Sequence, residues 1–176
     1  MRNSIIETDR MILRPWKAED LPLFAKMNKD SRVMRYFPSI LTDEQTESFY
    51  KRIQSEFDRK GWGLYAVELK SNGTVIGSVG LHEIGFDANF TPGVEIGWRL
   101  DADYHNQGLA TEAAKEVLKL AQEKGLQRLY SFTAKQNSPS ERVMQKIGMT
   151  KAGEFEHPNL SLDSPLRTHV LYQIDL

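Results

Sequence analysis

The order of strand-like and helix-like patterns along the chain predicts its fold class. In the strand-like runs, apolar and polar residues alternate or β-branched residues gather, and Ser-Asn-Gly at 71–73 indicates a hairpin. That hairpin makes an early part of the sheet antiparallel. The predicted strands cover residues 10–16, two runs within 63–85, and then 93–100, 128–134 and 168–174.

Amphipathic runs between these strands predict helices. One begins with Thr42 and Gln45 at the spacing of a capping box, and another carries an apolar stripe at helical spacing before Gly125. Helices are expected over residues 17–30, 42–61, about 109–125 and 138–148. Together with a late strand–helix–strand crossover, this order predicts an α/β (α+β) fold.

Composition is that of an ordinary globular chain, and it excludes several kinds of chemistry. The sequence has 176 residues, 40% apolar and 27% charged, and we expect one domain spanning 1–176. A net charge of −1 gives no broad basic field, so general nucleic-acid binding is not expected. The absence of cysteine excludes disulfides, thiolate metal sites and a cysteine nucleophile. The 4 histidines are scattered, so no metal site is expected.

The first residues and the apolar runs bear on location. Residues 1–15 are too charged, and too poor in apolar residues, to resemble a signal peptide. No run approaches the roughly 20 apolar residues that a membrane-spanning helix needs. We therefore expect a cytoplasmic protein without a membrane partner.

Glycines mark two places where the backbone could approach a ligand. Gly97, inside the predicted strand 93–100, suggests a bulge or a close backbone approach. Gly108 lies in Asn-Gln-Gly-Leu-Ala-Thr, just where a helix begins and its amides are unpaired. Such a turn suits a phosphate or pyrophosphate, although a tolerant glycine near a helix end is the simpler alternative. The G-x-G-x-x-G and P-loop patterns are absent, which disfavours a dehydrogenase or kinase.

A second polar cluster follows the next predicted strand. Asn137 and Ser140 lie three positions apart at the start of the helix predicted over 138–148. The ends of adjacent strands are where α/β folds place ligands. A turn-forming asparagine and a helix-capping serine are the structural alternatives.

These two segments carry a family resemblance. YHNQGLATEA, 104–113, resembles the acyl-CoA pyrophosphate loop of the GNAT N-acetyltransferase superfamily, with Gly108 and Ala110 in its last two fixed places. NSPSERVMQKIGM, 137–149, resembles the corresponding segment of the RimJ/RimL branch, and ETDRMILRPWKAEDL resembles that branch's opening strand and helix. The match covers nearly the whole chain. One departure is His105, which stands where the wider superfamily has Gln or Arg.

The resemblance implies a mixed, mostly antiparallel sheet that opens between its fourth and fifth strands to admit acetyl-CoA. Residues 93–100 would form the fourth strand, and a bulge at Gly97 would free backbone groups for the pantetheine. The implied cofactor-binding residues are Trp98, Arg99, Leu100, His105, Asn106, Gln107, Gly108, Leu109, Ala110, Thr111 and Asn137.

The resemblance also implies direct acetyl transfer to an amine, without an acyl-enzyme. A backbone N–H near Trp98 would polarise the thioester carbonyl, Ser140 would protonate the thiolate, and Asn137 would orient the pantetheine or the amine. Glu95 is the candidate base, acting through a water, although a strand glutamate is as often solvated or salt-bridged. The histidines at 82, 157 and 169 are weaker candidates for the base.

The acceptor is the least defined part of the expectation. Tyr36, Phe37, Trp62 and Phe86 are expected to line its pocket, although aromatic residues at such positions are more often core. The acceptor would be a primary amine of a protein N-terminus or a small molecule. A non-catalytic acyl-CoA-binding module and transfer of another acyl group are the alternatives. An exposed edge formed by the C-terminal strand would allow a homodimer.

Overall fold

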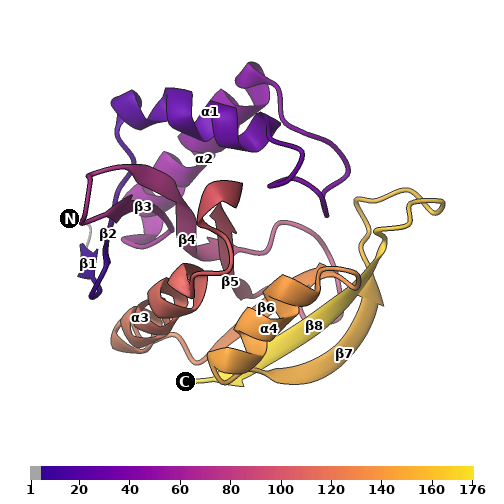
Figure 1. Ribbon diagram of the computed structural model, residues 1–176. Helices are drawn as coiled ribbons and strands as arrows, with labels where there is room; N and C mark the ends of the chain where they lie inside the picture. Colours follow the sequence, from indigo (N-terminus) through magenta and orange to yellow (C-terminus); the bar gives the residue numbers. More distant parts are fainter. Residues whose placement is uncertain (1–4) are drawn as a thin grey trace.

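The computed structural model describes residues 5–176, which form one mixed sheet flanked by helices (Figure 1). The 8-stranded sheet has the order β1-β2-β3-β4-β5-β6-β8-β7, and every neighbouring pair is antiparallel except β5 and β6. This arrangement confirms the predicted mixed, mostly antiparallel α/β fold. The strands are β1 (Ile6–Glu7), β2 (Met11–Arg14), β3 (Leu64–Leu69), β4 (Val75–Glu83), β5 (Val94–Leu100), β6 (Arg128–Ala134), β7 (Thr150–Glu156) and β8 (Thr168–Asp175).

The helices divide into two groups around the sheet. In Figure 1, α1 and α2 lie together at the top, whereas α3 and α4 lie below them in front of the sheet. No helix among residues 5–176 is long and apolar enough to cross a membrane. The helical elements are η1 (Ala18–Asp20), α1 (Leu21–Lys29), α2 (Asp43–Lys60), η2 (Ala102–Tyr104), α3 (Leu109–Glu123) and α4 (Ser138–Lys146).

Local sequence signals define the ends and buried faces of these helices. At the start of α2, Thr42 Oγ1 accepts from the Gln45 amide at 3.1 Å and Gln45 Oε1 accepts from the Thr42 amide at 2.8 Å, which confirms the capping box. The apolar stripe of α3 packs into the core, as its periodicity predicts. The stripe residues Leu109, Ala113, Val117 and Ala121 are all 2% exposed or less.

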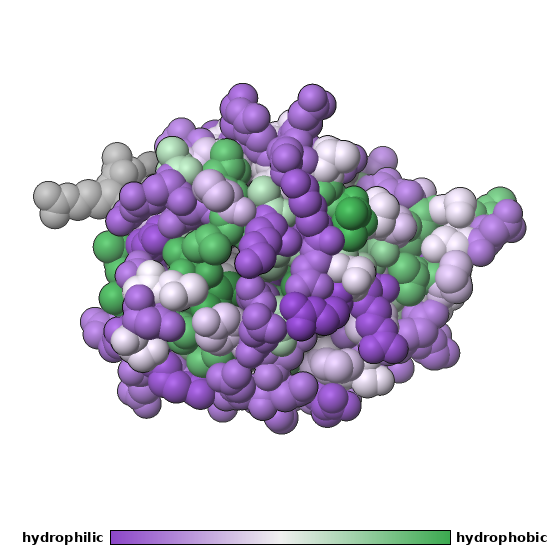
Figure 2. All heavy atoms as spheres, turned by 45° about the horizontal axis from the view of Figure 1, so that its top comes forward, coloured by the Kyte–Doolittle hydropathy of each residue, from purple (hydrophilic) through white to green (hydrophobic). Residues whose placement is uncertain are grey.

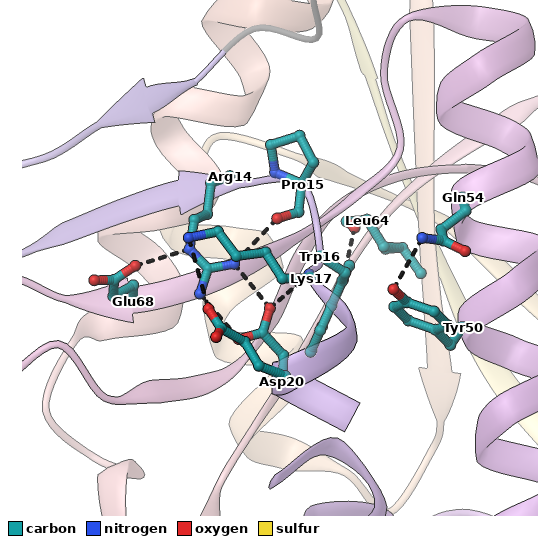
Figure 3. Close-up of polar contacts among 10 residues, drawn as sticks. Arg14, Pro15, Trp16, Lys17, Asp20, Tyr50, Gln54, Leu64 and Glu68 are labelled. Carbon is teal, nitrogen blue, oxygen red and sulfur yellow. Dashed lines mark hydrogen bonds and ion pairs between the residues drawn. The ribbon is translucent and has the colours of Figure 1, made fainter. Parts of the chain in front are cut away.

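A partly buried arginine, Arg14, ties β2 and β3 to the start of α1 (Figure 3). The Arg14 guanidinium donates to both carboxylate oxygens of Asp20, at 2.8 and 3.0 Å, and to Glu68 Oε2 at 2.8 Å. Burial opposes ionisation of Asp20, but the hydrogen bonds from Arg14 and from the Lys17 amide outweigh it and lower the pKa of Asp20. This network fixes the β2–β3 pair against η1.

The structure corrects three expectations about the sheet. The strands β1 and β7 were not expected. Because β1 precedes it in the chain, 93–100 is the fifth strand rather than the fourth. The C-terminal strand β8 lies between β6 and β7 and is not an edge, so it cannot pair two chains in a homodimer. Gly97 forms no bulge, because the β4–β5 register runs without interruption through the Gly80–Gly97 pair. The irregularities lie at Val67/Glu68 and Lys151/Gly153 instead.

Candidate active site

The site is organised by the opening between the two parallel strands. β5 and β6 share only the residue pair Glu95–Tyr130. Beyond that pair the edge of β5 that faces β6 has no strand partner, so the predicted opening is present between these strands. The β5 segment from Trp98 to Leu100 therefore lies along the opening, where its backbone groups could pair with an extended ligand.

The turn before α3 has a left-handed backbone that only some residues adopt easily. Asn106 and Gly108 adopt left-handed conformations, with φ of 62° and 76°, and Gly108 precedes the first residue of the helix. The first amides of α3 have no intrahelical partner. A Cβ at Gly108 would have Arg10 Nη2 as its nearest neighbour, at 3.6 Å, so the position is open to a ligand.

Side chains from the turn between β1 and β2 hold the Gly108 turn in place. Arg10 donates to the Gln107 carbonyl at 3.0 Å and forms an ion pair with Glu112 at 2.8 Å, while Thr8 Oγ1 donates to Glu112 Oε2 at 2.6 Å. The Glu112 carboxylate thus lies near the turn but is paired with Arg10. The sequence analysis missed Arg10 and Glu112, because two residues that lie 102 positions apart leave no local pattern.

His105 has a structural partner. Its Nε2 lies 2.9 Å from the Leu100 carbonyl oxygen, which connects the turn to the end of β5. The position where the superfamily carries Gln or Arg is therefore used to fix the backbone next to the opening.

Trp98, Asn137 and Ser140 are brought together across the opening. The Trp98 indole N–H donates to Ser140 Oγ at 3.2 Å. The Asn137 side chain caps α4, accepting from the Ser140 amide at 3.4 Å and donating to Thr133 Oγ1 at 2.9 Å. The Ser140 hydroxyl thus accepts one hydrogen bond and keeps its own proton for another partner.

Glu95 lies on the opposite face of β5 from Trp98, since side chains alternate along a strand. It pairs in register with His82 of β4 and is partly exposed. Desolvation by burial, with a further contribution from Glu56, raises the pKa of Glu95 to about 7, while His82 and Arg99 oppose the shift. A carboxylate with that pKa is suited to accept a proton near neutral pH.

His82 is occupied by a neighbouring carboxylate. Its Nδ1 lies 3.0 Å from Glu56 Oε1, and the other oxygen of Glu56 accepts from the Glu83 amide at 3.0 Å. The hydrogen bond with Glu56 raises the pKa of His82 despite burial. His82 is therefore held as a structural partner beside Glu95.

The other two candidate histidines lie in an aromatic cluster on β6, β7, β8 and the β4–β5 loop. The His157 and His169 ring centroids are 5.0 Å apart, and Phe86 lies 4.4 Å from His157. Burial lowers the pKa of His157 to about 4 and also lowers that of His169, so both are neutral at pH 7. The remaining members of this cluster are Phe90, Tyr130, Phe132 and Phe155.

The expected acceptor-lining residues separate into three groups, of which Phe86, in the aromatic cluster with His157, is one. Phe37 is 41% exposed and has the Arg99 guanidinium 4.5 Å from its ring, and Tyr36 precedes it in the α1–α2 loop. Trp62 is 6% exposed and belongs to the hydrophobic core, so it packs the interior rather than lining a pocket. Figure 2 views the α1–α2 side, where hydrophobic residues surface between hydrophilic ones.

Comparison with known proteins agrees with this geometry. The sequence profile of the family described as "Acetyltransferase (GNAT) domain" matches residues 10–150. The uncharacterized N-acetyltransferase YnaD of Bacillus subtilis is 30% identical over 153 residues, covering 86% of this chain and 85% of YnaD. The spermidine N(1)-acetyltransferase of Escherichia coli K12 is 29% identical over 153 residues, covering 82% and 75% of the two chains.

Solved structures share the fold over almost the full chain. A GNAT-family acetyltransferase from Bacillus anthracis superposes with a TM-score of 0.81 at 28% identity, covering 98% of each chain. RimJ of Mycobacterium smegmatis, solved with a CoA-disulfide, gives a TM-score of 0.77 at 18% identity, covering 97% and 86%, and is similar in fold alone. The opening between β5 and β6, the motif order and the family match lead to one conclusion: the chain belongs to the GNAT acetyltransferase family.

Proposed function

We propose that this N-acetyltransferase binds acetyl-CoA in the opening between β5 and β6 and transfers the acetyl group directly to a primary amine that enters from the α1–α2 side. The observation that carries the proposal is the single residue pair between β5 and β6. It leaves a strand edge for the pantetheine, and the edge leads to the left-handed turn at Gly108.

Acetyl-CoA would supply the acetyl group as a thioester. The amides of residues 106–111 would bind its pyrophosphate, and the backbone from Trp98 to Leu100 would hold the pantetheine and polarise the carbonyl. Gly97 supports this fit, because an added Cβ there would have no atom within 4 Å. A ligand could therefore come close to this face of β5, next to the strand edge.

Glu95 and Ser140 would move the protons. Glu95 would take the proton that the amine loses as its nitrogen bonds to the acetyl carbon, directly or through a water. Ser140 would give its proton to the sulfur as the carbon–sulfur bond breaks. The indole N–H of Trp98, which donates to Ser140 Oγ, would stabilise the negative charge left on that serine oxygen. Asn137 would act by holding Ser140 in place through the helix cap.

The acceptor class remains part of the proposal. A protein N-terminus and a small amine both satisfy the reaction, and the relative named as a spermidine acetyltransferase makes a polyamine one member of the second class. We also propose that the protein acts in the cytoplasm, as expected from its sequence.

The test combines donor binding with turnover. Acetyl-CoA is titrated calorimetrically into the wild type, Gly108→Trp and the matched control Gly125→Trp, and CoA release is followed with a panel of amines. Gly125 is also left-handed, with φ of 81°, and an added Cβ there meets no atom within 4 Å, so its variant reproduces the strain and bulk at the other end of α3.

We expect Gly108→Trp to lose at least tenfold in affinity and Gly125→Trp to bind as the wild type does. Equal binding by both variants would refute the cradle. Acetyl-CoA binding without CoA release for any amine would favour the non-catalytic alternative.

A further inference from the structure

The floor of the site on the α1–α2 side is formed by alternate residues of β5. Glu95, Gly97 and Arg99 share this face, and Arg99 contacts α1 directly through Asn28. The space above Gly97 is open, since an added Cβ would find no atom within 4 Å. Glu95 and Arg99 flank that space, each about 7 Å along the strand from Gly97.

The Arg99 guanidinium is held in a fixed position. Its Nη1 donates to Asn28 Oδ1 at 3.0 Å, and Asn28 in turn donates to Thr46 Oγ1 at 3.2 Å. Asn28 and Thr46 are both fully buried. Two aromatic rings lie beside the guanidinium, Phe37 with its centroid at 4.5 Å and Phe49 at 5.5 Å. These contacts orient the cation without neutralising it.

Arg99 has no carboxylate partner among residues 5–176, where no such oxygen lies within 4.0 Å of its nitrogens. Only one of its several N–H donors has a hydrogen-bond partner there. Burial lowers the pKa of Arg99 to about 10, which leaves the group charged at pH 7, and the residue is still partly exposed, so a ligand could reach it. A partly buried cation without a counter-ion is costly to the protein alone and favours binding an anion.

Glu95 is the acidic side chain that shares this face of β5 with Arg99. The nearby carboxylate of Glu56 is already hydrogen-bonded to His82, with Oε1 3.0 Å from Nδ1. The carboxyl of Glu95, whose pKa is about 7, is partly ionised near neutral pH and offsets part of the Arg99 charge without contacting the guanidinium. A polycationic acceptor would meet repulsion from the Arg99 guanidinium, whereas a carboxylate would be attracted to it.

We propose that Arg99 determines acceptor specificity by binding a carboxylate of the acceptor while the acceptor's amino group lies over Gly97. The inference rests on the proposed function and names its substrate class: a primary amine that carries a carboxylate a few bonds away, as in an amino acid. A planar guanidinium forms paired hydrogen bonds with a carboxylate, which gives direction as well as attraction.

The experiment compares each of several amino acids with its own carboxamide, using acetyl-CoA as donor. The quantity measured is the ratio of kcat/KM for the acid to kcat/KM for the amide, in the wild type and in Arg99→Gln. Comparing ratios between proteins removes the difference in amine pKa between acid and amide. We expect Arg99→Gln to lower the ratio by about 10- to 100-fold and Arg99→Lys to retain part of it.

Arg52→Gln is the matched control, since it removes another arginine that stacks on Phe49. We expect its ratio to equal that of the wild type. Thermal melts show whether each variant is folded, and Gln at position 99 keeps a donor for Asn28. An unchanged ratio in Arg99→Gln, or an equal loss for acid and amide, would overturn the inference.

Two further arms locate the carboxylate and separate this inference from the proposed function. If Arg99→Gln instead loses a preference for succinyl-CoA over acetyl-CoA, the carboxylate belongs to the acyl donor and the inference is wrong. If no amine is acetylated, the proposed function fails. Calorimetric titration of the amino acids onto the CoA-bound protein then decides the inference: binding lost in Arg99→Gln supports it, and no binding by the wild type overturns it.

Discussion

Replacing Glu95 with Gln tests the proton-transfer role in the most direct way. The change keeps the size of the side chain and leaves the backbone of β5 intact, but removes the group that would accept the proton. General bases contribute about 10²- to 10⁴-fold to rate, so we expect kcat at pH 8 to fall by at least about 100-fold. Calorimetric affinity for acetyl-CoA should stay within about twofold, because its proposed contacts on β5 are made by the backbone.

The pH dependence gives the sharper result. With the pKa of Glu95 at about 7, kcat/KM should fall tenfold for each pH unit below that value and level off above it. The assay needs an acceptor amine whose own pKa lies below about 6, so that its titration does not produce the same profile. His82→Asn shows which group titrates, since His82 pairs with Glu95 in register and has a raised pKa. The inflection should persist in His82→Asn and disappear in Glu95→Gln.

Stability provides an independent measurement on the same variant. Because folding raises the pKa of Glu95 from its ordinary 4.5 to about 7, the folded state binds more protons between these values, and stability falls as pH rises through them. The full shift corresponds to about 3 kcal/mol. Discounted for the partial exposure of the side chain, we expect Glu95→Gln to raise the free energy of unfolding at pH 8 by about 1–2 kcal/mol. A wild-type profile without an inflection near pH 7, or one that persists in Glu95→Gln, would refute the assignment.

Two further predictions address the leaving group and the scaffold. Ser140→Ala should lower kcat about 10- to 100-fold with little change in acetyl-CoA affinity; Trp98→Phe should lower it less, and the double variant should match Ser140→Ala, because both changes affect one hydroxyl. Additive losses of kcat in stopped-flow turnover would contradict this, because they would mean that Trp98 and Ser140 act independently. Arg14→Met should destabilise the fold by about 3–5 kcal/mol in urea unfolding, because it leaves the buried Asp20 without its partner. Asp20→Asn in the same background should recover part of that loss, and no recovery would contradict the pairing.

The elements that were predicted correctly are those with local causes. The capping box at Thr42, the periodic stripe of α3 and the start of α3 just after Gly108 all depend on residues within a few positions of one another. The strand β7 was missed because Thr150–Glu156 is largely exposed and bulged at Lys151/Gly153, so it lacks a buried alternating face. Antiparallel pairing with β8 holds these residues in a strand.

Gly97 illustrates how a correct signal can be given the wrong cause. The glycine was interpreted as a bulge that separates β5 from β6, but its register with β4 is regular. The divergence appears in the pairing of β6 instead. This strand shares one residue pair with β5 but seven with β8. The missing Cβ instead leaves open space above the strand.

The donor and acceptor sides of the site differ in how far sequence can describe them, and the reason is chemical. The donor side is proposed to use backbone amides and carbonyls, which need only a left-handed glycine and small neighbours, so a short motif around Gly108 is sufficient to indicate it. The acceptor side depends on side chains from α1, the α1–α2 loop, α2 and β5, where Arg99 meets Asn28, Phe37 and Phe49. Arg99 was expected to contribute only its backbone. Once the fold places its side chain beside the open space over Gly97, the same strand can hold the donor with its backbone and select the acceptor with its side chains.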